Sequence, residues 1–189
     1  RKILNQYFQK KTMPSGKTHD KISWYFFIPF SFIVWYLTRE WMLVVLFAFA
    51  YLFSSFMFGG DLDLVSVQSK RWGIFRWIWI PYRKFIPHRS SLSHGMVVGT
   101  TFRLFYLGFF IALFYGICYL LTEKYFPVEN KELVKTTYHG YIYIKNQPPT
   151  YFASIFAGLV TGAGLHTISD LTVSKVKRIF KPKKKRFRK

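Results

Sequence analysis

The chain has 189 residues, of which 51% are hydrophobic and 22% aromatic, and its 28 Lys and Arg outnumber its 8 Asp and Glu. Soluble domains rarely combine this aromatic content with long uncharged stretches, so the composition argues against an ordinary soluble fold. The single cysteine, Cys118, excludes an intrachain disulfide.

Four uncharged stretches predict helices that cross a membrane. They cover residues 22–38, 41–60, 104–122 and 151–169, and each is 17 to 20 residues long. A helix needs about 17–25 predominantly apolar residues to span a bilayer. The sequence therefore predicts an all-α integral membrane protein, a four-transmembrane-helix bundle within residues 13–174. A basic N-terminal extension (1–12) and a polybasic tail (175–189) flank this domain.

Two segments between the predicted spans carry patterns of their own. Residues 70–85, KRWGIFRWIWIPYRKF, interleave Trp, Phe and Ile with Arg and Lys, which predicts an amphipathic helix in the membrane interface. We expect this segment to cover part of the site described below. Residues 135–145, KTTYHGYIYIK, alternate β-forming residues around a glycine, which predicts a short external hairpin or loop.

The distribution of Lys and Arg predicts the orientation. Basic residues gather before residue 22, between residues 61 and 95, and in the tail. By the positive-inside rule these segments and both termini are cytoplasmic, in a bacterial inner or thylakoid-type membrane. A basic tail beside a membrane helix favours anionic lipid headgroups over nucleic acid as its partner.

The few acids and histidines fall on this same predicted face. The chain has only four aspartates, and each lies close to a histidine or to another aspartate in sequence. The candidate metal ligands are His19, Asp20, Asp61, Asp63, His94, His166 and Asp170. His and Asp donors suit zinc best, with manganese and iron as alternatives. Seven donors exceed the needs of one tetrahedral zinc, so the sequence allows one or two ions.

The last apolar stretch adds a packing pattern to this site. Gly158, Gly162, His166 and Asp170 recur every four residues and so share one face of a helix. Small residues at this spacing allow a neighbouring helix to approach closely. The same face would then present the imidazole and the carboxylate to the interior of the bundle. Ionisable groups at membrane depth require a partner in the interior of the protein, and a bound cation is one such partner.

Four stretches carry a family resemblance: MPSGKTHDKI, GGDLDLVS, PHRSSLSHG with the following GTTFRLFYL, and GAGLHTISD. They resemble an uncharacterised family of metal-binding integral membrane proteins common in cyanobacteria. The Asp-x-Asp, Ser-His and His-x3-Asp pattern is also similar to the inner-membrane metal-dependent hydrolases. The resemblance covers about residues 13–174. The family has proline where this chain has Gly60, and the resemblance implies metal binding more strongly than catalysis.

Two functions remain open from the sequence. In the first, the protein is a metal-dependent phosphoester hydrolase in which a metal-bound hydroxide or His88 carries out the proton transfer. Arg89, helped by Arg83 or Arg103, would hold the phosphate. In the second, it is a non-catalytic, metal-stabilised subunit or assembly factor of a larger membrane complex.

Overall fold

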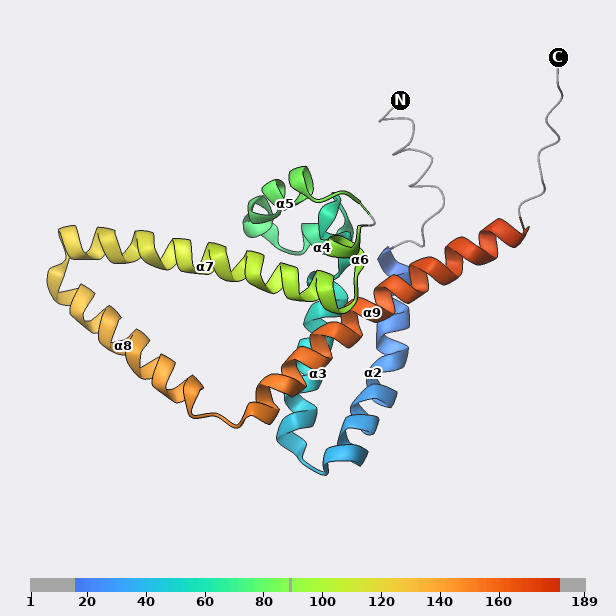
Figure 1. The fold of residues 1–189 in the computed structure, drawn as a ribbon, viewed down its shortest axis with the longest axis horizontal. Coiled ribbons are helices and arrows are strands. Elements are labelled where there is room, and N and C mark those ends of the chain that lie inside the picture. The colour runs from blue at the N-terminus through green and yellow to red at the C-terminus, as the bar shows by residue number, and fades with distance from the viewer. Residues whose placement is uncertain (1–15, 89, 181–189) are drawn as a thin grey trace, which may run out of the picture.

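The computed structural model describes residues 16–88 and 90–180, and every regular element within them is helical (Figure 1). The all-α prediction is thus confirmed for this part of the chain; the predicted extension 1–12 and residues 181–189 of the tail lie outside it. The α-helices are α2 (Gly16–Thr38), α3 (Trp41–Met57), α4 (Val67–Lys70), α5 (Trp79–Phe85), α6 (Ser91–His94), α7 (Val97–Tyr125), α8 (Pro127–Lys145) and α9 (Pro149–Phe180). Two 3₁₀ helices, η1 (Gly60–Asp63) and η2 (Gly73–Ile78), complete the order.

Helices α2, α3 and α9 pack together into the main body of the protein (Figure 1). The contact between α3 and α9 depends on two glycines of the predicted stripe. A Cβ atom on Gly158 would lie 2.5 Å from the carbonyl oxygen of Phe47, and one on Gly162 would lie 2.6 Å from that of Tyr51. Both distances are shorter than real Cβ contacts allow. The prediction that small residues bring a neighbouring helix close is therefore confirmed.

Three helices are long and apolar enough to cross a membrane, over Trp41–Asp63, Val97–Tyr125 and Pro149–Thr172 of the described residues. The prediction of four such helices is wrong for α2. Its first turns contain His19, Asp20 and Lys21, so the uncharged part is restricted to residues 22–38. Within those 17 residues, Pro29, two serines, a threonine and four Trp or Tyr side chains lower the mean hydropathy, so α2 is less apolar than the three candidate spans.

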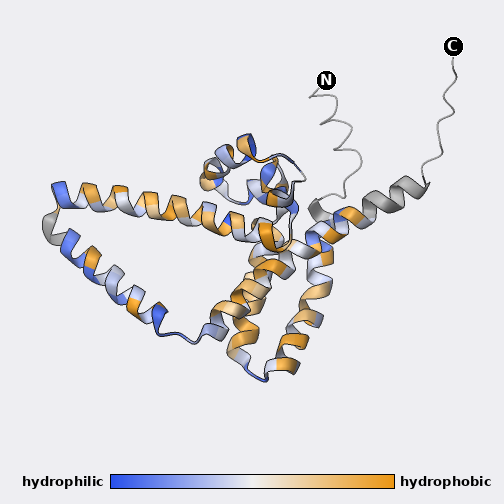
Figure 2. Cartoon of the chain, in the orientation of Figure 1, coloured by the Kyte–Doolittle hydropathy of each residue, from blue (hydrophilic) through white to orange (hydrophobic). Residues whose placement is uncertain are grey.

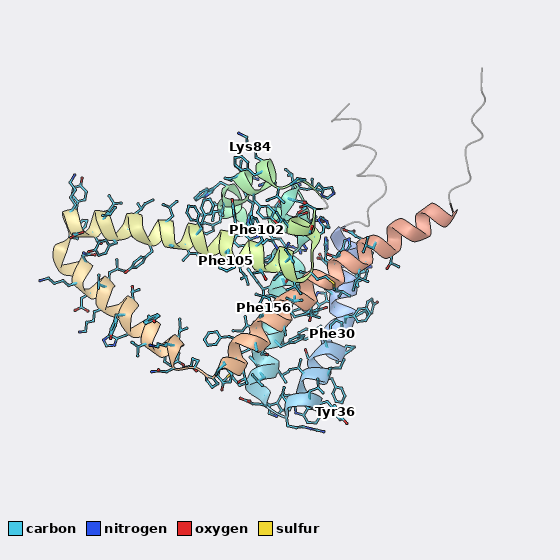
Figure 3. All side chains as sticks on the ribbon, in the orientation of Figure 1. Phe30, Tyr36, Lys84, Phe102, Phe105 and Phe156 are labelled. Carbon is cyan, nitrogen blue, oxygen red and sulfur yellow. The ribbon has the colours of Figure 1, made fainter. Side chains whose placement is uncertain are left out.

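Helices α7 and α8 extend away from the main body and return to α9 (Figure 1). Apolar residues predominate along most of α7, whose outer end is hydrophilic (Figure 2), and none of its most apolar stretch is buried. Its Phe105, labelled in Figure 3, is 76% exposed. Beyond its first turns, where Gly99, Thr100 and Arg103 are buried, α7 therefore has an apolar surface that is largely uncovered within this chain.

The predicted external hairpin over 135–145 is wrong, because these residues lie in the second half of α8. Pro127 occupies the first turn of that helix, where its fixed φ angle suits a helix start and its missing N–H costs no hydrogen bond. Thr137 donates its hydroxyl to the carbonyl of Leu133 four residues back. The helical backbone thus overrides the β-forming side chains, whose intrinsic preference is weak.

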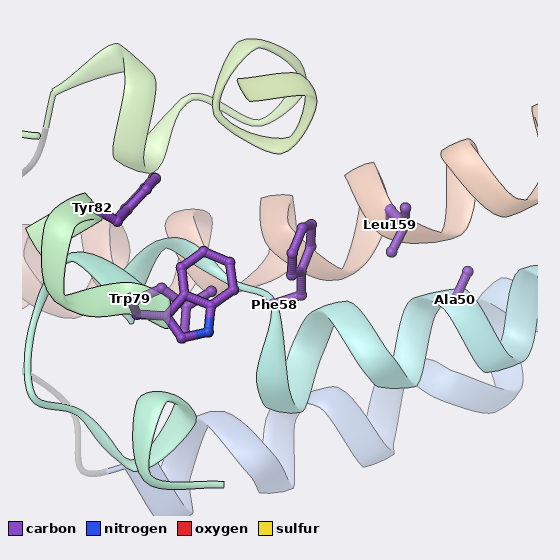
Figure 4. Packing of buried hydrophobic residues seen from close by; sticks show 6 residues of the cluster. Ala50, Phe58, Trp79, Tyr82 and Leu159 are labelled. Carbon is purple, nitrogen blue, oxygen red and sulfur yellow. The ribbon is translucent and has the colours of Figure 1, made fainter. Parts of the chain in front are cut away.

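The amphipathic helix predicted over 70–85 is confirmed only in part, because the segment is largely helical but is not one continuous α-helix. The chain turns at Gly73, whose φ of 56° lies in the left-handed region that favours glycine. The segment then forms η2 and α5 instead. Trp79 and Tyr82 of α5 are buried in the main apolar cluster, where the ring of Trp79 contacts those of Phe58 and Tyr82 (Figure 4). Part of the aromatic surface expected to face lipid thus forms protein core next to η1.

Candidate metal centre

Four elements and one connecting segment bring six of the predicted ligands, together with His88, to one end of the main body (Figure 1). His19 lies in the first turn of α2, and His94 is the last residue of α6. The 3₁₀ turn η1, which directly follows α3, supplies Asp61 and Asp63. The long helix α9 supplies His166 and Asp170, one turn apart. His88 lies between α5 and α6.

The first part of the centre lies between α2 and α9. Nε2 of His19 is 3.1 Å from Oδ1 of Asp170. Nε2 of His166 is 3.3 Å from Oδ2 of Asp61 and 3.7 Å from Oδ2 of Asp170. The rings of His19 and His166 lie 4.3 Å apart at their centroids. Two atoms bound to one tetrahedral zinc at about 2.0–2.1 Å lie about 3.3 Å apart, so these separations suit ligands of a common ion.

The second part lies between η1 and α6. Both carboxylate oxygens of Asp63 are 3.1 Å from Nδ1 of His88, and one is 3.6 Å from Nδ1 of His94. Nε2 of His94 lies 4.0 Å from Oδ1 of Asp61. Asp61 therefore reaches both parts, with one oxygen towards His166 and the other towards His94.

Three groups of these side chains have donor atoms close enough to hold an ion. They are His19 with His166 and Asp170, Asp63 with His88 and His94, and Asp61 with His94 and Asp170. The groups share His94 and Asp170, so the donors form one continuous cluster. Of the seven predicted ligands, the structure brings six together and adds His88.

The cluster has buried polar atoms that its own hydrogen bonds do not satisfy. Among the described residues, these atoms are Oδ1 of Asp61, Nε2 of His88, Nε2 of His94 and both ring nitrogens of His166. An unsatisfied buried polar atom costs about 1–3 kcal/mol, and more if it is charged. Concentrating so many atoms of this kind in one place is costly without a further partner. A metal ion would satisfy the donor atoms that face it, one ring nitrogen of each histidine among them, so these residues fit a metal ion.

Burial also favours the metal-binding form of one histidine outside the candidate spans. Burial is the main effect on the pKa of His94 and lowers it, although the nearby Asp63 and Asp61 oppose that change. A lower pKa keeps the imidazole neutral, which is the form that binds a metal.

Asp20 does not join the cluster. Its two carboxylate oxygens accept from both terminal nitrogens of Arg71, at 3.0 and 2.5 Å. Arg71 also donates to the carbonyl of Phe56 at the end of α3. No pattern in the sequence indicates this pairing, because Asp20 and Arg71 are 51 residues apart. The pair fixes the start of α2, and with it His19, against the end of α3.

We expect Asp20→Ala to keep the metal and to reduce the free energy of unfolding by about 1 kcal/mol or less, because the ion pair is partly exposed. Arg71→Ala removes the same ion pair. The double variant should therefore lose less free energy of unfolding than the sum of the losses in the two single variants. Metal content and thermal unfolding of the two single variants and the double variant check both expectations. Loss of metal from Asp20→Ala alone would restore Asp20 as a ligand.

Two of the three arginines expected to hold a phosphate, Arg83 and Arg103, form hydrogen bonds within the protein. Arg83 donates to the carbonyls of Trp79 and Arg76. Arg103 is buried and donates to the carbonyl of Ser93 and the hydroxyl of Thr100. Two nitrogens of each guanidinium are thus already bound to the protein, and Nε of Arg103 is buried without a hydrogen bond. Arg89 lies outside the described residues.

Comparison with known proteins identifies the family of the chain. A protein of Aquifex aeolicus (strain VF5), described as an uncharacterized protein, is 32% identical over 135 residues, which cover 70% of this chain and 92% of that relative. No solved structure matches the chain. A family model matches residues 14–180, which include every residue of the cluster. The chain belongs to that family, which is described as "Uncharacterized metal-binding protein (DUF2227)".

Proposed function

We propose that this protein is embedded in a membrane and holds a transition-metal ion at the cytoplasmic end of its helices. Three helices of suitable length and the basic segments beside the cluster support this placement. The ends of α2, α3 and α9 that carry the cluster adjoin the segments richest in Lys and Arg.

The observation that carries the proposal is the set of buried donor atoms without hydrogen bonds. Five side chains from two overlapping groups form the proposed ligand set: His19, Asp61, His94, His166 and Asp170. Zinc is the favoured ion, with manganese and iron as alternatives, because the donors are imidazole and carboxylate without thiolate. A second ion, if present, would occupy the group of Asp63, His88 and His94.

Hydrolysis of a phosphoester is the candidate reaction. A bound metal would supply an activated water and stabilise developing negative charge. Asp63 holds Nδ1 of His88 and leaves Nε2 buried without a hydrogen bond. A carboxylate that orients a histidine in this way prepares the opposite nitrogen for proton transfer. Arg89, next to His88 in sequence, is the candidate for holding the anionic group.

A role as a subunit or assembly factor is favoured by a different observation. The apolar surface of α7 is unburied within this chain, and other membrane proteins would cover such a surface as well as lipid does. Comigration with a large complex in native gels, with no activity after isolation, would support this role.

Metal analysis of protein extracted from membranes in mild detergent, without chelator, tests the proposed centre. We expect at least one transition-metal ion per chain, and its absence would defeat the proposal. The ratio of metal to protein also distinguishes one ion from two.

Hydrolysis is tested with zinc- or manganese-loaded protein and three substrates: a phospholipid, phosphatidic acid and a nucleotide. If the reaction exists, His88→Gln should retain the metal of the proposed ligand set and lower turnover by about 10²–10⁴-fold, the usual contribution of acid–base catalysis. Turnover that is no higher than in His88→Gln for every substrate would favour the subunit role.

A further inference from the structure

We propose that Ser169 and Ser93 are positioning residues, which hold His19 and His94 so that both rings present Nε2 to the metal. This inference rests on the proposed metal centre and assigns an atom to two of its ligands. In each case the serine oxygen accepts a hydrogen bond from Nδ1 of the ring, and the hydroxyl proton goes to a backbone carbonyl.

Ser169 belongs to α9 and meets the ring of His19 from α2. Its Oγ lies 2.9 Å from Nδ1 of His19. The same hydroxyl is 2.9 Å from the carbonyls of Leu165 and His166, one turn back in α9. A serine hydroxyl in a helix commonly donates to such a carbonyl. Its lone pairs are then free to accept the Nδ1 proton.

The opposite nitrogen of His19 confirms which atom faces the centre. Nε2 lies 3.1 Å from Oδ1 of Asp170, a residue of the proposed ligand set. When Nδ1 carries the proton, the lone pair of Nε2 points towards this carboxylate. A cation between the two atoms makes that arrangement favourable, because it attracts both. Ser169 and Asp170, adjacent in α9, thus hold the two sides of the His19 ring.

Ser93 makes the equivalent contact with His94. Its Oγ is 3.0 Å from Nδ1 of His94, and it reaches the carbonyls of Ser90 and Pro87 at 3.2 and 3.3 Å. Asp63, which only accepts when ionised, lies 3.6 Å from the same Nδ1 and also favours a proton there. Nε2 of His94 is buried without a hydrogen bond and faces Asp61.

The same arrangement occurs a third time with another acceptor. Nδ1 of His88 contacts Asp63, and its Nε2 is buried without a hydrogen bond. Three histidines from different parts of the chain thus have an acceptor at Nδ1. Histidines that bind metals almost always donate their second nitrogen in this way, which fixes the ring and strengthens the ligand.

The first test is metal affinity in the full chain, measured by competition for zinc with a chelator of known affinity. Ser169→Ala and Ser93→Ala should each weaken zinc binding about 10–100-fold, as loss of such a partner does at known sites. Ser154→Ala is the matched control. Ser154 also lies on α9, near the start of the helix and 12 residues before His166, and it donates to the carbonyl of Leu43. It should leave the affinity unchanged.

The second test identifies the bound nitrogen by NMR of zinc-loaded protein labelled with ¹⁵N in its histidines. The chain has five histidines, and the exposed His139 on α8 serves as an internal reference. We expect a proton on Nδ1 and zinc on Nε2 for both His19 and His94. Ser169→Ala should disturb the signals of His19 while sparing those of His94, and Ser93→Ala should do the reverse.

The outcomes separate this proposal from the one it rests on. Wild-type protein that takes up no zinc would overturn both. Zinc bound through Nδ1 of His19 or His94 would overturn the role of that serine while the metal centre stands. Unchanged affinity in both alanine variants would do the same.

Discussion

Asp61→Asn is expected to lower the metal affinity of the protein more than about a hundredfold, with little change in side-chain volume. The carboxylate of Asp61 lies between His166 on α9 and His94 on α6, and one of its oxygens is buried without a hydrogen bond. Even partners outside a ligand set cost about 10–100-fold when they are lost. A ligand that joins both parts of the centre should cost more. Metal content after dialysis and competition with a chelator measure the effect.

The matched control is Asp20→Asn. Asp20 was predicted as a ligand on the same grounds as Asp61, but it pairs with Arg71. It should therefore keep the metal. Equal metal loss from the two variants would contradict the ligand set, because it would place both aspartates in the centre or neither.

Most of the fold follows from features that the sequence states directly. Long uncharged stretches predict α3, α7 and α9, because only the length and polarity of one segment decide whether a helix can span a bilayer. The structure differs from the prediction where residues distant in sequence determine the conformation or the burial of a segment. The 135–145 segment has β-forming side chains but continues a helix that begins at Pro127. Trp79 and Tyr82 look interfacial in sequence, but the folded chain buries both of them in its main apolar cluster.

The candidate site was likewise predictable in part: its location follows from the sequence, but its side-chain contacts do not. The sequence predicts that His and Asp residues gather at one end, because the ends of membrane helices alternate between two faces. It does not predict which of two adjacent residues points inward: His19 enters the cluster, while Asp20 meets Arg71. No pattern in the sequence points to Ser169, because its proposed role depends on contact with His19 of α2, 150 residues away. Side-chain partners of this kind require the packed structure.

Gly162→Leu is expected to separate α9 from α3 and to release the metal without removing a ligand. Even a single Cβ atom at this position would lie 2.6 Å from the backbone oxygen of Tyr51 and 2.9 Å from the side chains of Ser54 and Ser55. The backbone oxygen has no rotamer by which to avoid the new atom. Overpacking commonly costs about 1–3 kcal/mol, and a leucine against backbone should reach or exceed the upper value. His166 lies one turn further along α9, so the shift should reach its imidazole.

The matched control is Gly116→Leu in α7, where an added Cβ atom would meet nothing within 4 Å. That variant should unfold at the same temperature as the wild type or higher, since leucine favours a helix more than glycine by up to about 1 kcal/mol. Thermal unfolding in detergent and metal content should thus fall together for Gly162→Leu and stay unchanged or rise for Gly116→Leu. A stably folded Gly162→Leu protein with full metal content would show that the centre does not depend on the close approach of α3 and α9. Equal damage from both leucines would indicate that α7 is packed in the membrane against a partner, which the subunit role requires.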